Sequence, residues 1–125
     1  MSFDEIKAKI HAASESVGRS DVQLIAVSKF QPASAIQELY DQGHRHFGEN
    51  YVQELTAKSK ELPQDIKWHL IGHLQSNKAK VVKDVPNLFS LDSLDSLSLA
   101  KKLETQLDRK LEVYIQINVS NEAQK

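Results

Sequence analysis

Five short apolar segments recur along the chain, and residues with helical spacing separate each one from the next. The apolar segments predict strands over 23–28, 44–49, 67–72, 87–92 and 112–119. Helices are expected between them, one opened by Ser34 and Gln37 and stopped by Gly43, the others over about 50–62, 76–83 and 94–109. A helix has to return the chain before the next parallel strand, so this alternation is typical of a parallel sheet. The chain is expected to be an α/β protein, either an open doubly wound sheet or a barrel.

A further amphipathic helix is expected to open the chain. Ser2 followed by Glu5 is a capping-box pattern, and Gly18 provides a stop. Apolar residues at helical spacing lie between them: Phe3, Ile6, Ile10, Ala13 and Val17.

The last predicted strand favours a barrel. Its apolar residues from Val113 to Val119 alternate with Tyr114, Gln116 and Asn118, and such a polar face is expected where strands line the interior of a barrel near its mouth. A closed eight-stranded barrel needs about 250 residues, and the chain has 125. It also stops soon after this strand, with no covering helix. We therefore expect the N-terminal portion of a TIM-type (β/α)8 barrel, with about five βα units and a leading helix.

Charge and composition exclude several classes of function. The 16 Lys and Arg residues nearly balance 17 Asp and Glu residues, a charge pattern that fits neither nucleic acid nor an anionic membrane as partner. The lack of cysteine excludes disulfides, thiolate metal sites and a thiol nucleophile. There is no signal-peptide core and no apolar run long enough to cross a bilayer. We expect one compact cytoplasmic unit with no nucleic-acid or membrane partner.

Polar residues follow the predicted strands at the end where parallel α/β proteins bind ligands. Lys29 is the most informative of them, because a lysine attacks a carbonyl only as the neutral amine and free lysine titrates near ~10.4. Partial burial at the end of an apolar strand lowers that pKa, as in lysines that bind aldehydes covalently. A solvated strand end explains Lys29 equally well. The other residues at this rim are Gly48, Glu49, Asn50, Gly72, His73, Asp92 and Asn118.

The other rim residues also have structural interpretations. Asn50 fits a helix N-cap with Gln53 completing the box, and Glu49 and Asp92 are either an acid–base pair or solvated carboxylates. His69 and His73 are four residues apart, a spacing that suits a metal only on a helix, whereas this segment is predicted to be a strand. No metal site is therefore expected. Three glycines have turn spacing rather than phosphate-loop spacing: Gly43, Gly48 and Gly72.

Four motifs are long and specific when taken together. They are AVSK at 26–29, FGENYVQE at 47–54, WHLIGHLQSNK at 68–78 and QINVS at 116–120. In this order they resemble the pyridoxal-phosphate homeostasis protein family, also described as alanine-racemase N-terminal-domain-like. The resemblance covers the chain from about residue 3 to residue 125.

The resemblance implies a barrel similar to the N-terminal domain of alanine racemase. Such a barrel binds pyridoxal 5'-phosphate as an internal aldimine, a Schiff base, on the lysine that aligns with Lys29. Asn50 would lie near the cofactor, and His73 and Asn118 are further candidates by their strand-end positions. Lys125 falls where family members carry another lysine. Residues 1–125 would then be a partial barrel domain that lacks its C-terminal units.

The role implied by the resemblance is not catalytic. The family resembles a racemase barrel without the second domain that supplies the opposing tyrosine base, and none of Tyr40, Tyr51 and Tyr114 lies in a matching motif. The implied role is to carry or buffer the cofactor, to deliver it to pyridoxal-phosphate-dependent apo-enzymes, and to balance vitamin B6 and amino-acid pools. An amino-acid racemase is the alternative.

The chain departs from the family pattern at its C-terminal end. The phosphate-binding segments of the family lie in the last three βα units, which are missing, so cofactor binding is expected to be weak. The first and fifth strands would be unpaired edges. The parent protein is expected to be a monomer, and this chain is expected to associate with another copy or with its missing half, or to fold poorly. A third interpretation is a structural fragment that pairs through its edges and does no chemistry.

Overall fold

One parallel sheet organises the molecule. The computed structural model describes residues 2–120. Its strands follow one another in chain order across the sheet, as in a barrel wall, whereas a doubly wound sheet reverses its order at a switch point. The expected parallel α/β fold is confirmed. The strands are β1 (Ala26–Val27), β2 (His46–Glu49), β3 (Lys67–Leu70), β4 (Leu88–Leu94) and β5 (Glu112–Ile115).

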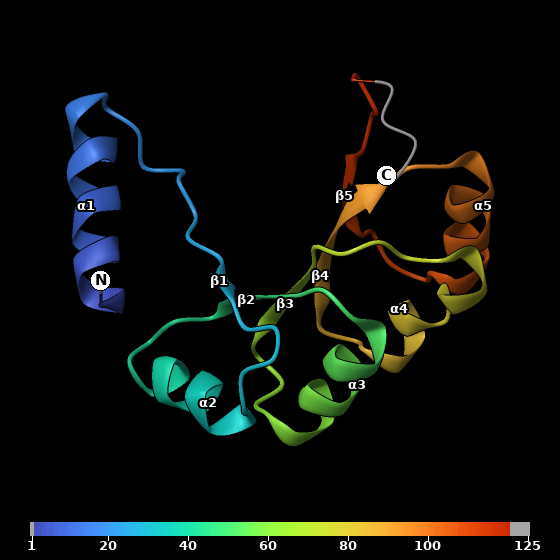
Figure 1. Cartoon of the computed structure of the whole chain (residues 1–125), viewed down its shortest axis with the longest axis horizontal. Coiled ribbons are helices and arrows are strands. Elements are labelled where there is room, and N and C mark those ends of the chain that lie inside the picture. The colour runs from blue at the N-terminus through green and yellow to red at the C-terminus, as the bar shows by residue number, and fades with distance from the viewer. Residues whose placement is uncertain (1, 121–125) are drawn as a thin grey trace.

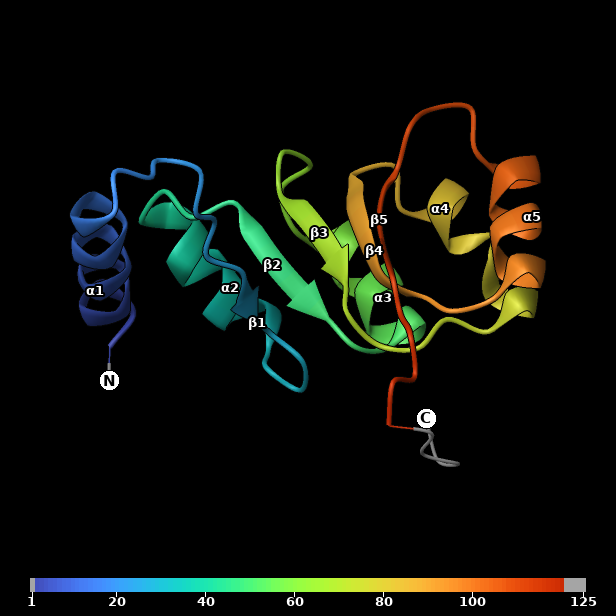
Figure 2. The same cartoon turned by 90° about the horizontal axis from the view of Figure 1, so that it is seen from above.

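The helices that follow β1 to β4 cover one side of this curved sheet, here called the outer face (Figure 1). Seen from above, the strands lie between α1 at one end and α4 and α5 at the other (Figure 2). The helices are α1 (Phe3–Ser16), α2 (Ala33–Asp41), α3 (Val52–Glu61), α4 (Val81–Asp84) and α5 (Leu97–Gln106), with a 3-10 turn over Ser76–Lys78. In the described part of the chain, no helix has both the length and the apolar character needed to cross a bilayer.

The hydrophobic core lies between the outer face and the helices. Phe47 of β2 and Trp68 of β3 are fully buried, with ring centroids 6.1 Å apart. Leu55 of α3 and Leu99 of α5 belong to the same cluster. Burial of one such side chain contributes roughly 1.5–3 kcal/mol, so this layer holds the middle of the sheet together.

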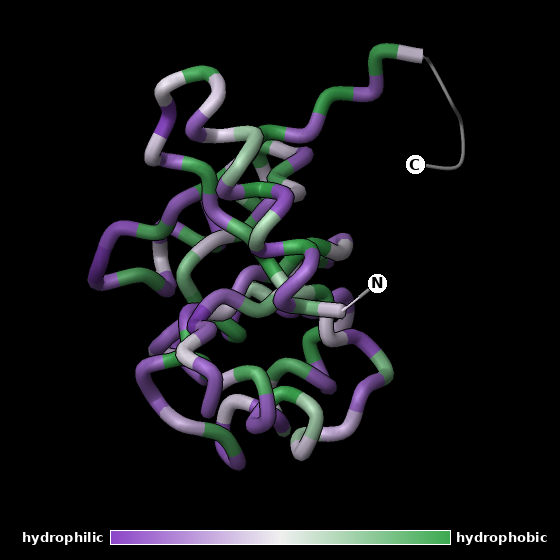
Figure 3. The backbone as a smooth tube through the Cα atoms, turned by 90° about the vertical axis from the view of Figure 1, so that its left-hand side faces the viewer, coloured by the Kyte–Doolittle hydropathy of each residue, from purple (hydrophilic) through white to green (hydrophobic). Residues whose placement is uncertain are grey.

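The opposite side, here called the inner face, is open. Val27 of β1 is 53% exposed and Phe89 of β4 is 40% exposed, and every residue of β5 is exposed. Among residues 2–120, no further strand pairs with β1 or β5, which are the two edges of the sheet as expected. Residues 116–120, which follow β5, extend away from the rest and alternate in hydropathy (Figure 3).

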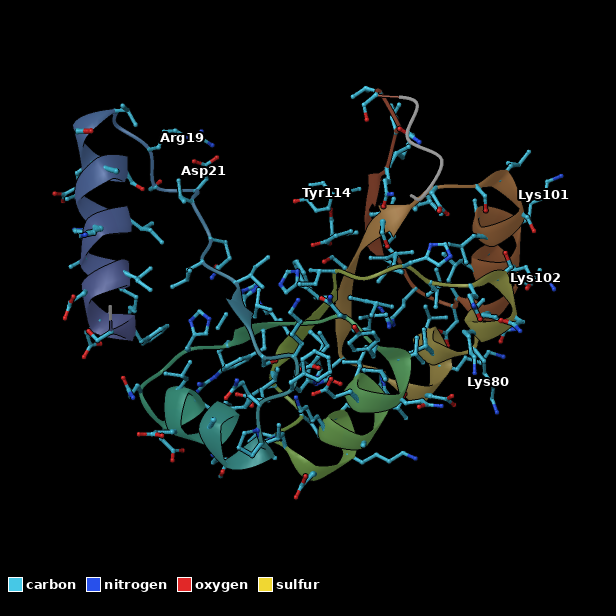
Figure 4. All side chains as sticks on the ribbon, viewed as in Figure 1. Arg19, Asp21, Lys80, Lys101, Lys102 and Tyr114 are labelled. Atoms are coloured by element: carbon cyan, nitrogen blue, oxygen red, sulfur yellow. The ribbon has the colours of Figure 1, made fainter. Side chains whose placement is uncertain are left out.

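Helix α1 forms as predicted and packs only loosely, with the Phe3 ring edge-on to that of His44. Ser2 caps it by accepting a hydrogen bond from the Glu5 amide, and Gly18, at φ +67°, follows its end. None of its residues is buried. The linker to β1 carries an exposed ion pair between Arg19 and Asp21, 2.9 Å apart (Figure 4).

The outer strands are shorter than the sequence predicted. β1 has two residues instead of the six over 23–28, because only Ala26 and Val27 have partners on β2. β5 ends at Ile115 instead of residue 119, because β4 ends at Leu94, the partner of Ile115. A strand extends only as far as its neighbour offers hydrogen bonds. The helix predicted over 76–83 is replaced by the 3-10 turn and the four-residue α4.

Candidate functional site

Lys29 lies in a tight turn directly after β1. The turn is closed by a hydrogen bond of 3.1 Å from the Gln31 amide to the Ser28 carbonyl. Phe30, its third residue, has φ +62°, a left-handed conformation that costs a bulky residue roughly 1–3 kcal/mol. The surrounding contacts therefore have to hold this turn in place.

The side chain of Lys29 is exposed. Of the two interpretations of Lys29, the structure agrees with the solvated strand end, because no described element covers the inner face near the end of β1. Within residues 2–120, the Lys29 amine makes no hydrogen bond or ion pair. An uncommitted amine on a fixed turn is available to an incoming carbonyl compound.

A buried polar cluster lies directly beneath this turn. It consists of Ser28, Glu49 of β2, and Glu54 and Lys58 of α3. Lys58 Nζ lies 2.9 Å from Glu49 Oε2, 2.7 Å from Glu54 Oε2 and 2.8 Å from the Ser28 carbonyl oxygen. The Ser28 hydroxyl donates to Glu49, and the Phe30 amide donates to Glu54 Oε2 at 2.7 Å. The cluster therefore contacts the chain on both sides of Lys29.

This cluster changes the interpretation of Glu49. The sequence suggested a rim carboxylate, either solvated or paired with Asp92, but Glu49 points into the helix layer and is fully buried. Burial raises the pKa of the Glu49 carboxyl, against the hydrogen bonds from Ser28 and Lys58. The hydrogen bond from Lys58 lowers the pKa of Glu54. Sequence reasoning missed Lys58, although Glu54 and Lys58 have the i,i+4 spacing of a helical ion pair.

Asn50 and His73 lie together, as expected of residues at neighbouring strand ends. Both line a cavity of about 240 Å³ at the start of α3. His73 Nδ1 lies 3.3 Å from Asp95. The other lining residues are Tyr51, Val52, Gln53, Gln75 and Lys78.

Asn50 does not cap α3. Tyr51 occupies the cap position and makes no side-chain capping bond, and Pro32 rather than Ser34 precedes α2 in the same way. The Asn50 backbone instead lies against Gly72, where a Cβ atom would meet the Asn50 carbonyl oxygen at 2.1 Å. Only glycine permits this approach of two strand ends. Gly48, by contrast, is a strand residue of β2 and not the turn glycine that its spacing suggested.

The cavity and the turn of Lys29 are neighbours. Tyr51 lines the cavity, and its ring centroid lies 5.4 Å from that of Phe30, the residue after Lys29. Neither Lys29 nor Asn118 lines this cavity. Asn118 follows β5 in an exposed segment, and Lys125 lies outside the described residues.

A hydrogen-bonded line of side chains crosses the sheet. The Ser90 hydroxyl donates to Asp92 Oδ1 at 2.6 Å, so it accepts from His69 Nδ1, also 2.6 Å away. His69 Nε2 is then left to accept from His46 Nδ1 at 2.8 Å. This arrangement needs a neutral His69 imidazole, because one of its nitrogens donates and the other accepts, whereas His46 only donates. Burial lowers the pKa of both histidines, that of His46 to about 4.

His69 lies on β3 as predicted, so its spacing to His73 is not helical. Within residues 2–120, no group of three or more His, Asp or Glu side chains is arranged to hold a metal ion. Larger cavities lie away from the strand ends, one of about 540 Å³ beside α1 and one of about 620 Å³ between α5 and β5. Neither is lined by a predicted site residue.

Residues 1–122 match the family model described as "Alanine racemase, N-terminal domain". The chain is 42% identical over 126 residues to the pyridoxal phosphate homeostasis protein of Schizosaccharomyces pombe, covering 98% of this chain and 52% of that protein. It is 46% identical over 113 residues to the human protein of the same name, covering 82% of this chain and 41% of the relative.

A solved structure has the same fold. PipY of Synechococcus elongatus PCC7942, with PLP bound, matches with a TM-score of 0.70 and 45% identity, over 86% of this chain and 53% of PipY. The chain thus spans about half the length of the relatives it matches.

Proposed function

The chain belongs to the alanine racemase N-terminal domain family, and from this premise we propose that it binds pyridoxal 5'-phosphate through Lys29. The observation that carries the proposal is the uncommitted Lys29 amine on a fixed turn at the carboxyl end of β1. The PLP-bound state of PipY, 45% identical to this chain, supports it. Residues 1–125 then form the N-terminal part of a cofactor-binding barrel domain.

The residues present suit such a ligand. Lys29 would hold the cofactor through its aldehyde group, since an unpaired lysine amine on a fixed turn is the residue type that binds aldehydes covalently. Asn50 and His73 offer an amide and an imidazole from the adjoining cavity. Asn118 is a further polar contact from the end of the sheet beyond β5. The cofactor supplies an electron-withdrawing ring for amino-acid chemistry when bound.

The role proposed for the parent protein is to carry and buffer the cofactor rather than to catalyse a reaction. In this role it delivers the cofactor to apo-enzymes and keeps vitamin B6 and amino-acid pools in balance, with the cytoplasm as the proposed compartment. The names of the relatives support this assignment. Within residues 2–120, no tyrosine hydroxyl or carboxylate hydrogen bonds to Lys29 as a second proton-transfer group. Tyr40, for example, donates to Asp65 at 2.6 Å.

Racemase activity is the alternative, and a direct assay separates the two functions. A carrier leaves the α-proton of alanine in place in deuterated water, whereas a racemase exchanges it. Exchange above the rate of free cofactor, lost in Lys29→Ala, would contradict the carrier proposal.

Trapping with borohydride tests the site itself. The chain is mixed with pyridoxal 5'-phosphate, reduced, digested and mapped by mass spectrometry. Label is expected mainly on the peptide that contains Lys29, and Lys101→Arg serves as a matched exposed-lysine control. Exposed lysines on α5 and near α4, such as Lys101, Lys102 and Lys80, report non-specific labelling (Figure 4). Label spread evenly over the lysines would overturn the assignment of Lys29.

The remaining alternative is a structural fragment that does no chemistry and associates with other copies through the open edges of its sheet. β5 is exposed along its length and has one free edge, so self-association through it is expected. Light scattering with and without cofactor measures this association. Ile115→Lys, which places a charge on the edge strand, is expected to reduce the associated fraction several-fold. An unchanged size distribution would show that association uses another surface.

A further inference from the structure

The buried cluster beneath β1 is more elaborate than a strand end needs. Glu49 is fully buried and the Lys58 side chain is 9% exposed. Placing two charges this deep costs several kcal/mol per ion unless they are paired and hydrogen-bonded. An apolar pair would fill the same space at lower cost. The buried charges are therefore expected to do more than fill space, and the segment they fix in place indicates their role.

Hydrogen bonds of the cluster involve the residues on both sides of Lys29, its own member Ser28 and the neighbouring Phe30. Lys58 binds the Ser28 carbonyl, and the Ser28 hydroxyl binds Glu49. Glu54 accepts the Phe30 amide at 2.7 Å. The residues before and after Lys29 are thus fixed from below, while the Lys29 side chain itself is left uncommitted.

The strained backbone of Phe30 points to the same purpose. Its φ of +62° disfavours a bulky side chain, and the Phe30 ring is 72% exposed, so core packing does not impose this conformation. The hydrogen bond to Glu54 is the contact that holds the amide of this residue. Strain held by a charged group next to the reactive residue is typical of a pre-organised site.

We propose that Glu54 and Lys58, together with Glu49, are positioning residues that fix the turn carrying the Lys29 amine for reaction with an aldehyde. This inference rests on the proposed function. It adds that the selectivity of Lys29 over the other lysines comes from the cluster below the turn.

The test compares two glutamates of the same helix. Glu54 is 22% exposed at its side chain, so Glu54→Ala removes a partly accessible group and is expected to fold. Glu61→Ala, at the exposed end of α3, is the matched control. The readout is the ratio of borohydride-trapped label on Lys29 to that on exposed lysines such as Lys101.

Glu54→Ala is expected to lower this ratio roughly tenfold, in line with the loss of a charged hydrogen bond, and Glu61→Ala is expected to leave it unchanged. Glu54→Gln keeps an oxygen acceptor for the Phe30 amide and is expected to retain most of the selectivity. Equal ratios in wild type and Glu54→Ala would overturn the inference. A ratio near one in the wild type would instead overturn the proposed function, so the two failures are distinguishable.

A second measurement needs no cofactor. Amide hydrogen exchange in the apo chain is expected to show faster exchange at Phe30 in Glu54→Ala, with unchanged protection at core amides such as Trp68. Unchanged exchange at Phe30 would contradict the positioning role even if labelling fell. Faster exchange at both residues would show that the variant destabilises the whole fold. That result would also contradict a positioning role confined to the turn of Lys29.

Discussion

The middle and the two ends of this molecule follow the same sequence rules but differ in burial. β2, β3 and β4 place Phe47, Trp68 and Leu91 in the core, each less than 1% exposed. α1 and β5 have equally regular patterns, yet neither contains a buried residue. Periodicity therefore determined which elements form, whereas burial depends on which partner elements are present to pack against them.

The largest expected contrast between the two regions comes from truncating one aromatic residue in each. Phe47→Ala removes a fully buried ring and is expected to lower the free energy of unfolding by about 3–5 kcal/mol. Tyr114→Ala, at a residue 65% exposed on β5, is expected to change it by less than about 0.5 kcal/mol. Urea titration followed by Trp68 fluorescence measures both. Similar losses for the two variants would show that β5 is packed in solution.

Lowering the pH is expected to reduce the free energy of unfolding, because protonation of the histidines in the middle of the sheet is disfavoured in the folded state. Burial lowers the folded-state pKa of His46 from 6.5 to about 4, and those of His44 and His69 also lie below the usual value. The unfolded chain therefore takes up protons first as the pH falls. The contribution of His46 is fully present above about pH 6.5 and is lost as the pH falls toward about 4, and solvent screening at this partly exposed ring keeps it modest.

The matched variant for this prediction is His46→Gln, which keeps a hydrogen-bonding side chain beside His69. It should flatten the dependence of the urea midpoint on pH across that interval. The raised pKa of Glu49 acts in the opposite direction and remains in both proteins. A dependence just as steep in His46→Gln would assign the acid sensitivity to other groups.

The smallest contrast uses helix caps. Ser96 caps α5, which buries Leu99 and Leu103, and Ser2 caps α1, which contains no fully buried residue. Ser96→Ala is expected to cost about 1 kcal/mol of global stability. Ser2→Ala should reduce helical circular dichroism slightly without moving the urea midpoint. A shift of the midpoint in Ser2→Ala would show that α1 unfolds together with the core.

The sequence was sufficient to predict all five strands, because each combines an apolar run with nearby turn residues. It overestimated β1 and β5, since periodicity does not reveal where a neighbouring strand stops. The order of the strands also required the structure.

For the candidate site, the sequence placed Lys29, Asn50 and His73 at strand ends, because parallel strands end at one rim, and their role in binding stays a prediction. It placed Glu49 at that rim, but alternation along β2 turns this carboxylate into the helix layer toward Lys58. The contacts of Lys58 with Ser28 span 30 residues, and no local pattern reports such a distance. The exposure of Lys29 likewise depends on which elements cover the inner face.

The central claim is that one particular amine, that of Lys29, holds the cofactor. Intact-mass spectrometry after borohydride reduction, at equimolar cofactor, tests it directly by counting cofactor molecules per chain in the wild type and in Lys29→Ala. A single addition is expected on the wild-type chain and almost none on Lys29→Ala. Equal additions on both chains would contradict it.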